Sequence, residues 1–188
     1  MYKSILKWIL ALVIQPSKAW TVLNKKKNQT DDVLGGFVYP IIGCLTLIAF
    51  VGVLITHKAS DVQMALKSAI TILASSFGGF YLAVYMLNEL GVKFLNREKD
   101  LNLWKHFVAY GSSLMFALNA ILILIPEFFF LRICVLYTFY IIWEGAPIYM
   151  QVEEKDQQKF VGIVTAVILF VPYIVESILY LLMPGLRI

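Results

Sequence analysis

The sequence has few charged residues, few histidines and few cysteines. Charged residues make up 15% of its 188 residues and it contains 2 His and 2 Cys, whereas hydrophobic residues make up 60%. Soluble domains carry roughly a quarter charged residues, so a soluble fold is excluded. Glycine-rich phosphate loops, serine nucleophile motifs and clusters of His and Cys are also missing. We therefore expect no enzyme, no cofactor and no metal site.

Five long apolar runs dominate the chain. They cover residues 34–56, 68–90, 104–125, 128–150 and 160–183. Each run is long enough to cross a hydrocarbon core of about 30 Å as a helix that rises about 1.5 Å per residue. Only Pro126 and Glu127 separate the third run from the fourth, which predicts a tight helical hairpin. We predict an all-α membrane protein in which residues 34–188 form five transmembrane helices and residues 1–33 form a cytoplasmic amphipathic collar.

The positive charges predict the orientation of the chain. Most lysines and arginines precede the first run or lie between the second and third runs and between the fourth and fifth. Cytoplasmic segments carry such an excess, so we expect a cytoplasmic N-terminus and, after five spans, an external C-terminus. His57 and His106 then fall on opposite sides and cannot share a metal. The net charge of +4 favours anionic lipid head groups as partners, and nucleic acid is not expected.

Residues 1–14 allow two interpretations. Lys3 and Lys7 before an apolar stretch resemble a signal peptide, but a lysine cluster follows closely, and positive charge at that place opposes export. The favoured interpretation is an amphipathic helix in the membrane interface, ended by Pro16 and followed by a second short helix. The expected membrane-interface residues are Trp8, Trp20, Lys25, Lys26 and Lys27.

Polar residues inside the apolar runs are candidates for function, because charges within a bilayer are costly. Arg132, Glu176 and Asn119 fall at a similar depth near the outer ends of their helices, so we expect them to form an outer polar layer. One interpretation is a pair of charges that fixes how the helices pack, and the other is a substrate site.

Glu144 belongs to a second layer nearer the cytoplasm. About 14 Å of depth separates it from Glu176, so the two acids cannot form a close pair. Its expected neighbours in a candidate polar intramembrane site are Tyr85, Tyr110 and Ser113. The carboxyl group is either protonated and bonded to a tyrosine or a site for a proton or cation, because Gly145 and Pro147 loosen the helix there.

Several short motifs follow one another along the chain. They are Pro16 with Trp20, Tyr39-Pro40-Ile41-Ile42-Gly43, Tyr110-Gly111, Ile125-Pro126 and Glu144-Gly145-Ala146-Pro147. Their order and spacing resemble the Yip family of five-span membrane proteins in its compact bacterial form. The resemblance implies a bacterial inner membrane and, in eukaryotic members, association with Rab-type GTPases. This sequence lacks the long N-terminal region and the acidic Tyr-Gly-Pro motif of those members, so GTPase binding is not expected.

Three classes of function fit these features. The resemblance and the basic collar favour a membrane organiser or adaptor, whose partners are membrane lipids, other membrane or cytoplasmic proteins, or a second copy of the chain. The alternative is a transporter or channel for a proton, an ion or a lipid, which would use Glu144 and Glu176. The third class is an intramembrane enzyme, which would need a polar cavity open to one face.

Overall fold

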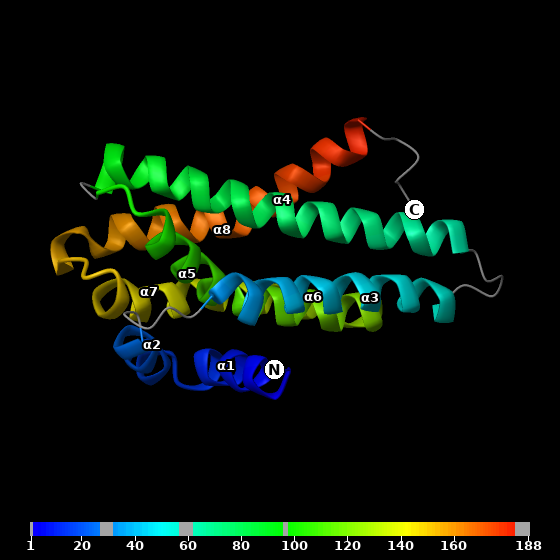
Figure 1. Ribbon diagram of the computed structural model, residues 1–188, viewed down its shortest axis with the longest axis horizontal. Helices are drawn as coiled ribbons and strands as arrows, with labels where there is room; N and C mark the ends of the chain where they lie inside the picture. Colours follow the sequence, from blue (N-terminus) through cyan, green and yellow to red (C-terminus); the bar gives the residue numbers. More distant parts are fainter. Residues whose placement is uncertain (1, 27–31, 57–61, 96–97, 183–188) are drawn as a thin grey trace.

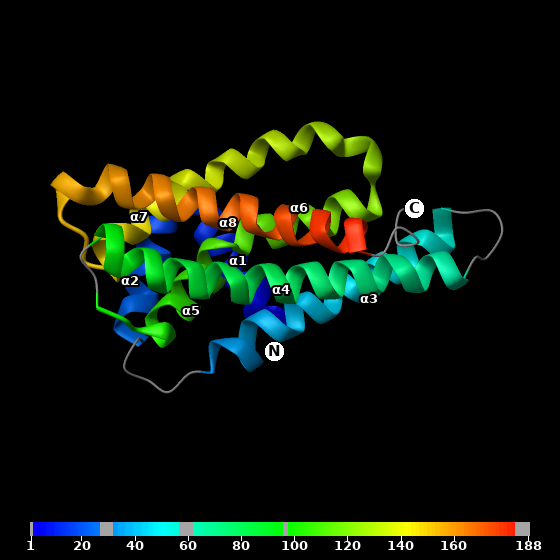
Figure 2. The same cartoon turned by 90° about the horizontal axis from the view of Figure 1, so that it is seen from above.

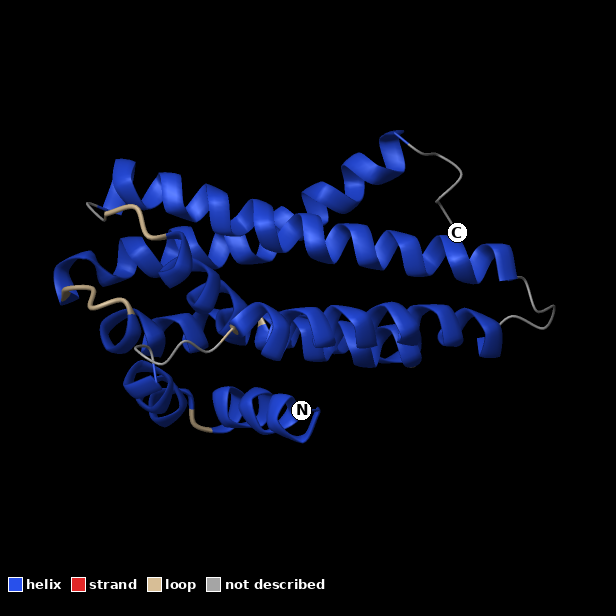
Figure 3. Cartoon of the chain, in the orientation of Figure 1, coloured by secondary structure: helices blue, strands red, loops and turns tan. Residues whose placement is uncertain are grey.

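The computed structural model describes residues 2–26, 32–56, 62–95 and 98–182. These residues form helices joined by short connections, and no β-strand occurs among them (Figure 3). The prediction of an all-α fold is confirmed. Figure 1 shows long helices running side by side, with a pair of short N-terminal helices along one side of the bundle.

Four helical segments of the described chain are each long and apolar enough to cross a membrane. The helices that form them are η1 (Leu34–Val38) continued by α3 (Tyr39–Thr56), then α4 (Val62–Leu95), then η2 (Pro126–Tyr137) continued by α7 (Thr138–Tyr149), and α8 (Glu154–Leu182). A fifth span results if the bent pair α5 (Leu101–Gly111) and α6 (Ser113–Leu124) is counted as one. The chain is therefore an integral membrane protein, and the count of five spans stays a prediction.

The third predicted span is broken in its middle. The sequence predicts one continuous helix over residues 104–125, but α5 ends at Gly111 and α6 continues with a bend of 43°. Glycine and serine are weak helix formers in a helix interior. The glycine also lets α8 pack closely here, because a Cβ on Gly111 would lie 3.3 Å from the Ile168 side chain.

The chain reverses at Pro126, as the sequence predicts. Ile125 has φ −133° and ψ 80°, outside the α-helical region that a following proline disfavours. η2 then runs back along α6 as a tight helix and continues into α7. Figure 2 shows η2 at the edge of the molecule, where it bows away from α8 before α7 rejoins the bundle.

Aromatic rings fill the core at the end of the bundle where α4 ends and α8 begins. Trp20 stacks on Phe107 with ring centroids 5.0 Å apart, and Trp104 stacks on Phe160 at 5.9 Å. Both tryptophans are almost completely buried, as is Tyr149 beside Phe107. Such rings supply a large buried area and restrict each other's orientation. This cluster fixes the N-terminal helices to the bundle.

Candidate functional site

Two short helices, α1 (Tyr2–Ile14) and α2 (Pro16–Lys26), precede the long helices; we call them the docked pair. Pro16 opens α2, where its fixed φ suits the first helical turn and its missing N–H costs nothing. Figure 1 shows the docked pair on one side of the bundle, with α2 near α7. The predicted pair of short helices is therefore present, while its place in the membrane interface stays a prediction.

α2 has one buried face and one polar face. Its buried residues recur three and four positions apart, which is the pattern of an amphipathic helix packed on a core. They are Pro16, Ala19, Trp20 and Leu23. The opposite face carries Ser17, Lys18, Thr21 and Lys25, all exposed. The buried face of α2 therefore packs against the bundle, and its polar face is free.

Trp20 attaches α2 to α7. Its indole Nε1–H donates a hydrogen bond of 2.8 Å to the carbonyl oxygen of Ile141. The ring lies directly against Gly145, where a Cβ would come within 2.6 Å of the indole Cε2. Trp20 is completely buried in the protein, and its place at the membrane interface stays a prediction. The indole satisfies its N–H inside the protein and fills space that a side chain at Gly145 would occupy.

α1 packs less completely than α2. Ile5 and Leu12 are buried against the bundle, and the Tyr137 hydroxyl donates to the Val13 carbonyl oxygen over 3.0 Å. The free side of α1 is mixed, because its lysines lie beside large apolar residues. The exposed residues there are Lys3, Leu6, Lys7, Leu10 and Ile14.

The other predicted interface residues lie near one another at the docked pair. Trp8 is half-buried, packs on Tyr110 with ring centroids 6.1 Å apart, and has the Lys26 ammonium 5.6 Å from its ring centroid. Such a cation over an indole face is attractive. Lys25 and Lys26 are exposed, and Lys27 lies outside the described residues.

The residues of the predicted site around Glu144 differ in their surroundings. Glu144 is half-buried, and its hydrogen-bonding partner is the Tyr140 side chain one turn earlier on the same helix. Tyr85 is 56% exposed on α4. Tyr110 packs among the rings of Trp8, Trp20 and Phe37. The Ser113 hydroxyl is fully buried without a hydrogen-bond partner.

The outer polar layer, in contrast, surrounds one cavity of about 180 Å³. Arg132 reaches it from η2, Glu176 from α8 and Asn119 from α6. Further polar lining comes from residues that the sequence analysis did not single out for a site: Ser75, Ser76, Ser112 and Tyr173. Their only signal in the sequence is a position inside an apolar run. Glu144 does not line this cavity.

A close contact between α4 and α8 shapes the cavity wall. Gly79 on α4 meets α8, because a Cβ there would lie 2.8 Å from the Pro172 Cα. A glycine at this position lets α4 and α8 pack closely. Pro172 has no N–H to donate to the carbonyl oxygen of Ile168, and both residues line the cavity.

Pro147 creates a similar gap in α7, and a side chain fills it. A proline inside a helix leaves the carbonyl oxygen four residues earlier without its usual donor, which here is that of Trp143. The Gln157 amide on α8 donates to this oxygen over 3.0 Å. Pro147 therefore links α7 to α8.

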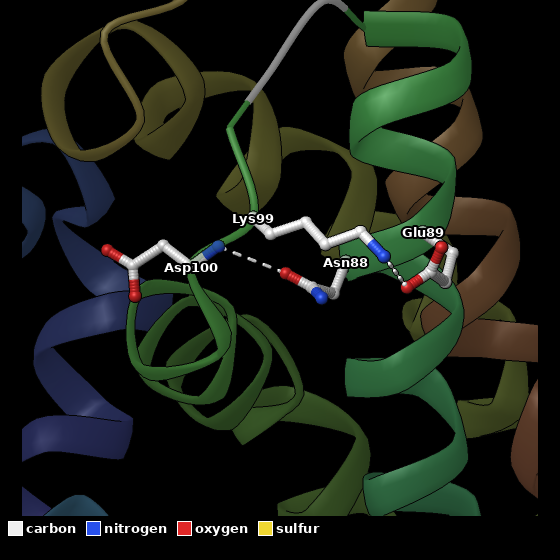
Figure 4. Close-up of polar contacts among 4 residues, drawn as sticks. All are labelled: Asn88, Glu89, Lys99 and Asp100. Atoms are coloured by element: carbon white, nitrogen blue, oxygen red, sulfur yellow. Dashed lines mark hydrogen bonds and ion pairs between the residues drawn. The ribbon is translucent and has the colours of Figure 1, made fainter.

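A polar cluster fixes the start of α5 to α4. Asp100 receives the Leu103 N–H on its side chain, which caps α5, and donates its own backbone N–H to the Asn88 side chain over 3.1 Å. Lys99 pairs with Glu89 nearby (Figure 4).

Among the described residues, no group of three or more His, Cys, Asp or Glu side chains is placed to bind a metal.

Comparison with known proteins agrees with this architecture. A family model described as the Yip1 domain matches residues 10–175. The matched range begins within α1 and ends within α8, so it contains α2, the broken third span and most of the cavity lining. No curated protein and no solved structure matches the chain significantly.

Proposed function

Since the chain belongs to the Yip1 domain family, we propose that this integral membrane protein organises the lipid around it by means of the docked pair. The observation that carries the proposal is the exposed side of α1. Leu6 is 59% exposed and Ile14 69%, although the opposite side of the same helix is buried in the bundle.

A helix that presents apolar side chains beside lysines is suited to the boundary between head groups and acyl chains. The apolar side chains enter the lipid, and Lys3 and Lys7 extend their ammonium groups to the phosphates. A free interfacial helix can move away from the protein that carries it. α1 cannot, because Leu12 and the bond from Tyr137 hold it against the bundle.

The free face of α2 adds electrostatic attraction. Lys18, Lys25 and Lys26 are exposed, and each basic residue close to an anionic surface contributes about 1 kcal/mol of attraction. This charge supports a location of the docked pair on the cytoplasmic side of a bacterial inner membrane. The same polar face is available to cytoplasmic proteins. The protein acts by binding, and no chemical reaction is part of the proposal.

Reconstitution into vesicles tests the proposal. We expect the unaltered chain to reduce vesicle diameter in cryo-electron micrographs, because a wedge in one leaflet favours curvature. A variant with Leu6→Asn, Leu10→Asn and Ile14→Asn should lose this effect at equal protein density. The matched control replaces the same three residues by Met, which keeps their apolar character. The proposal fails if the Asn variant, with an unchanged melting temperature, still narrows the vesicles as the Met variant does.

A further inference from the structure

Two opposite charges line one cavity without neutralising each other. Arg132 makes no ion pair or hydrogen bond with any residue in the described part of the chain, and Glu176 accepts only the Tyr180 hydroxyl, over 3.0 Å. Charged side chains within a membrane ordinarily pair with each other or with backbone carbonyls. Their arrangement here leaves an anion site and a cation site around the same space.

The space between them accommodates a polar group. A cavity holds one water molecule once it offers roughly 10–15 Å³, and this cavity offers about 180 Å³. Asn119, Ser76 and Ser112 supply further donors and acceptors along its wall. Apolar residues, among them Val108 and Phe80, complete the lining.

An apolar groove adjoins this cavity across one side chain. Tyr173 lines the cavity and also a shallow, open groove of about 420 Å³ on one face of α8. The remaining groove residues are Phe170, Ile174, Ser177, Ile178 and Leu181. Ile174 and Leu181 are 51% and 80% exposed, on a helix that crosses the membrane. The groove therefore faces acyl chains.

We propose that the cavity and the groove together bind one phospholipid whose head group is phosphoethanolamine. Arg132 binds the phosphate through its guanidinium fork. Glu176 and Asn119 accept hydrogen bonds from the ammonium group, and one acyl chain follows the groove past Tyr173. This binding site is separate from the docked pair and is independent of its proposed role.

The chemistry of the two charges decides between head groups. Phosphatidylglycerol supplies a phosphate for Arg132 but only neutral hydroxyl groups, and no cation, for Glu176. Phosphatidylcholine has a cation without an N–H, so it makes no hydrogen bond to Glu176 or Asn119. Only phosphatidylethanolamine among these three lipids combines a phosphate for Arg132 with a cation that donates N–H hydrogen bonds to Glu176.

Native mass spectrometry of the full chain in detergent tests the proposal, with the three lipids carrying identical acyl chains. We expect one bound phosphatidylethanolamine at lipid concentrations where the other two remain unbound. Removal of one charge-assisted hydrogen bond weakens binding by about tenfold or more, so Arg132→Gln and Glu176→Gln should each weaken retention by that factor. Lys159→Gln and Glu154→Gln are matched controls, because both residues are exposed at the opposite end of α8.

Two comparisons on the unaltered chain keep the test decisive if a variant does not fold. Equal retention of phosphatidylglycerol and phosphatidylethanolamine overturns the proposal. Displacement of the lipid by soluble glycerophosphoethanolamine at equal concentration also overturns it, because the groove would then contribute nothing. Loss of retention in the Lys159 and Glu154 variants to the same extent as in the cavity variants would show a general charge effect and would likewise refute the site.

Discussion

Side-chain size at one position, Gly145, decides whether α2 can pack on α7. A Cβ there would come within 2.6 Å of the buried Trp20 indole, and neither partner has room to move. We predict that Gly145→Ala destabilises the protein by about 1–3 kcal/mol, the usual cost of overpacking. Thermal unfolding in detergent measures this change.

Gly43→Ala is the control for that prediction. Gly43 also lies in a helix, but a Cβ there meets no atom within 4 Å. Alanine is the better helix former by about 1 kcal/mol, so this change should raise the melting temperature slightly. Equal changes in melting temperature for Gly145→Ala and Gly43→Ala would contradict the contact between Trp20 and Gly145.

The hydrogen bond from Gln157 to the Trp143 carbonyl gives a second prediction at this scale. Gln157→Ala leaves a carbonyl without a donor beside Pro147, which should cost about 1–3 kcal/mol of stability. With Pro147→Ala already present, the new backbone N–H bonds the carbonyl, and Gln157→Ala should then cost less than half as much. A double-mutant cycle of unfolding free energies measures this coupling; zero coupling would refute the account.

At the scale of elements, a hydrogen bond from the Tyr137 hydroxyl holds the C-terminal end of α1 against the bundle. A neutral hydrogen bond contributes about 0.5–1.5 kcal/mol. Tyr137→Phe should therefore speed amide hydrogen exchange in residues 2–14 by roughly threefold to tenfold, while α4 and α8 keep their rates. Tyr140→Phe, in the next turn, is the control, and faster exchange of α1 in both variants would contradict the prediction.

The sequence predicts the elements well where composition alone decides them. The apolar runs match the long helices, and Pro126 predicts the hairpin because proline ends a helix and forces its predecessor to extend. The sequence analysis does not predict the break at Ser112, because it infers one continuous helix from the length of the apolar run. Gly111 and Ser112 are weak helix formers, and this signal is left out of that inference. The continuous helix was a prediction from length, and local propensity decided the bend.

The sequence likewise predicts some features of the candidate sites and not others. Counting residues from the helix ends placed Arg132 and Glu176 at one depth, and both line the same cavity. The depth of a residue in the membrane does not tell how its helix is rotated about its own axis. Depth alone therefore cannot predict which side chains lie beside Glu144. Trp20 was assigned to the interface because tryptophan is common there. Its partner is a backbone carbonyl 121 residues away, and no local pattern contains that information.

At the scale of the whole molecule, the number of spans decides where the two ends lie. If α5 and α6 form one bent span, five crossings put the termini on opposite sides of the membrane; without it, four crossings put them on the same side. We predict that a fluorescent reporter at the N-terminus is active in the cytoplasm and a phosphatase at the C-terminus is active outside. An inactive phosphatase at the C-terminus, together with an active reporter at the N-terminus, would contradict the five-span topology.

The bond between Trp20 and Ile141 also constrains the order of events during synthesis. Its two residues are 121 positions apart, and ribosomes add about 5–20 residues per second, so the acceptor emerges roughly 6–24 seconds after the indole. Throughout that interval α2 exists without α7. The newly made helix has no partner for the buried face of Trp20 during that time, and its arrival on α7 marks a chain whose fourth apolar run has been made.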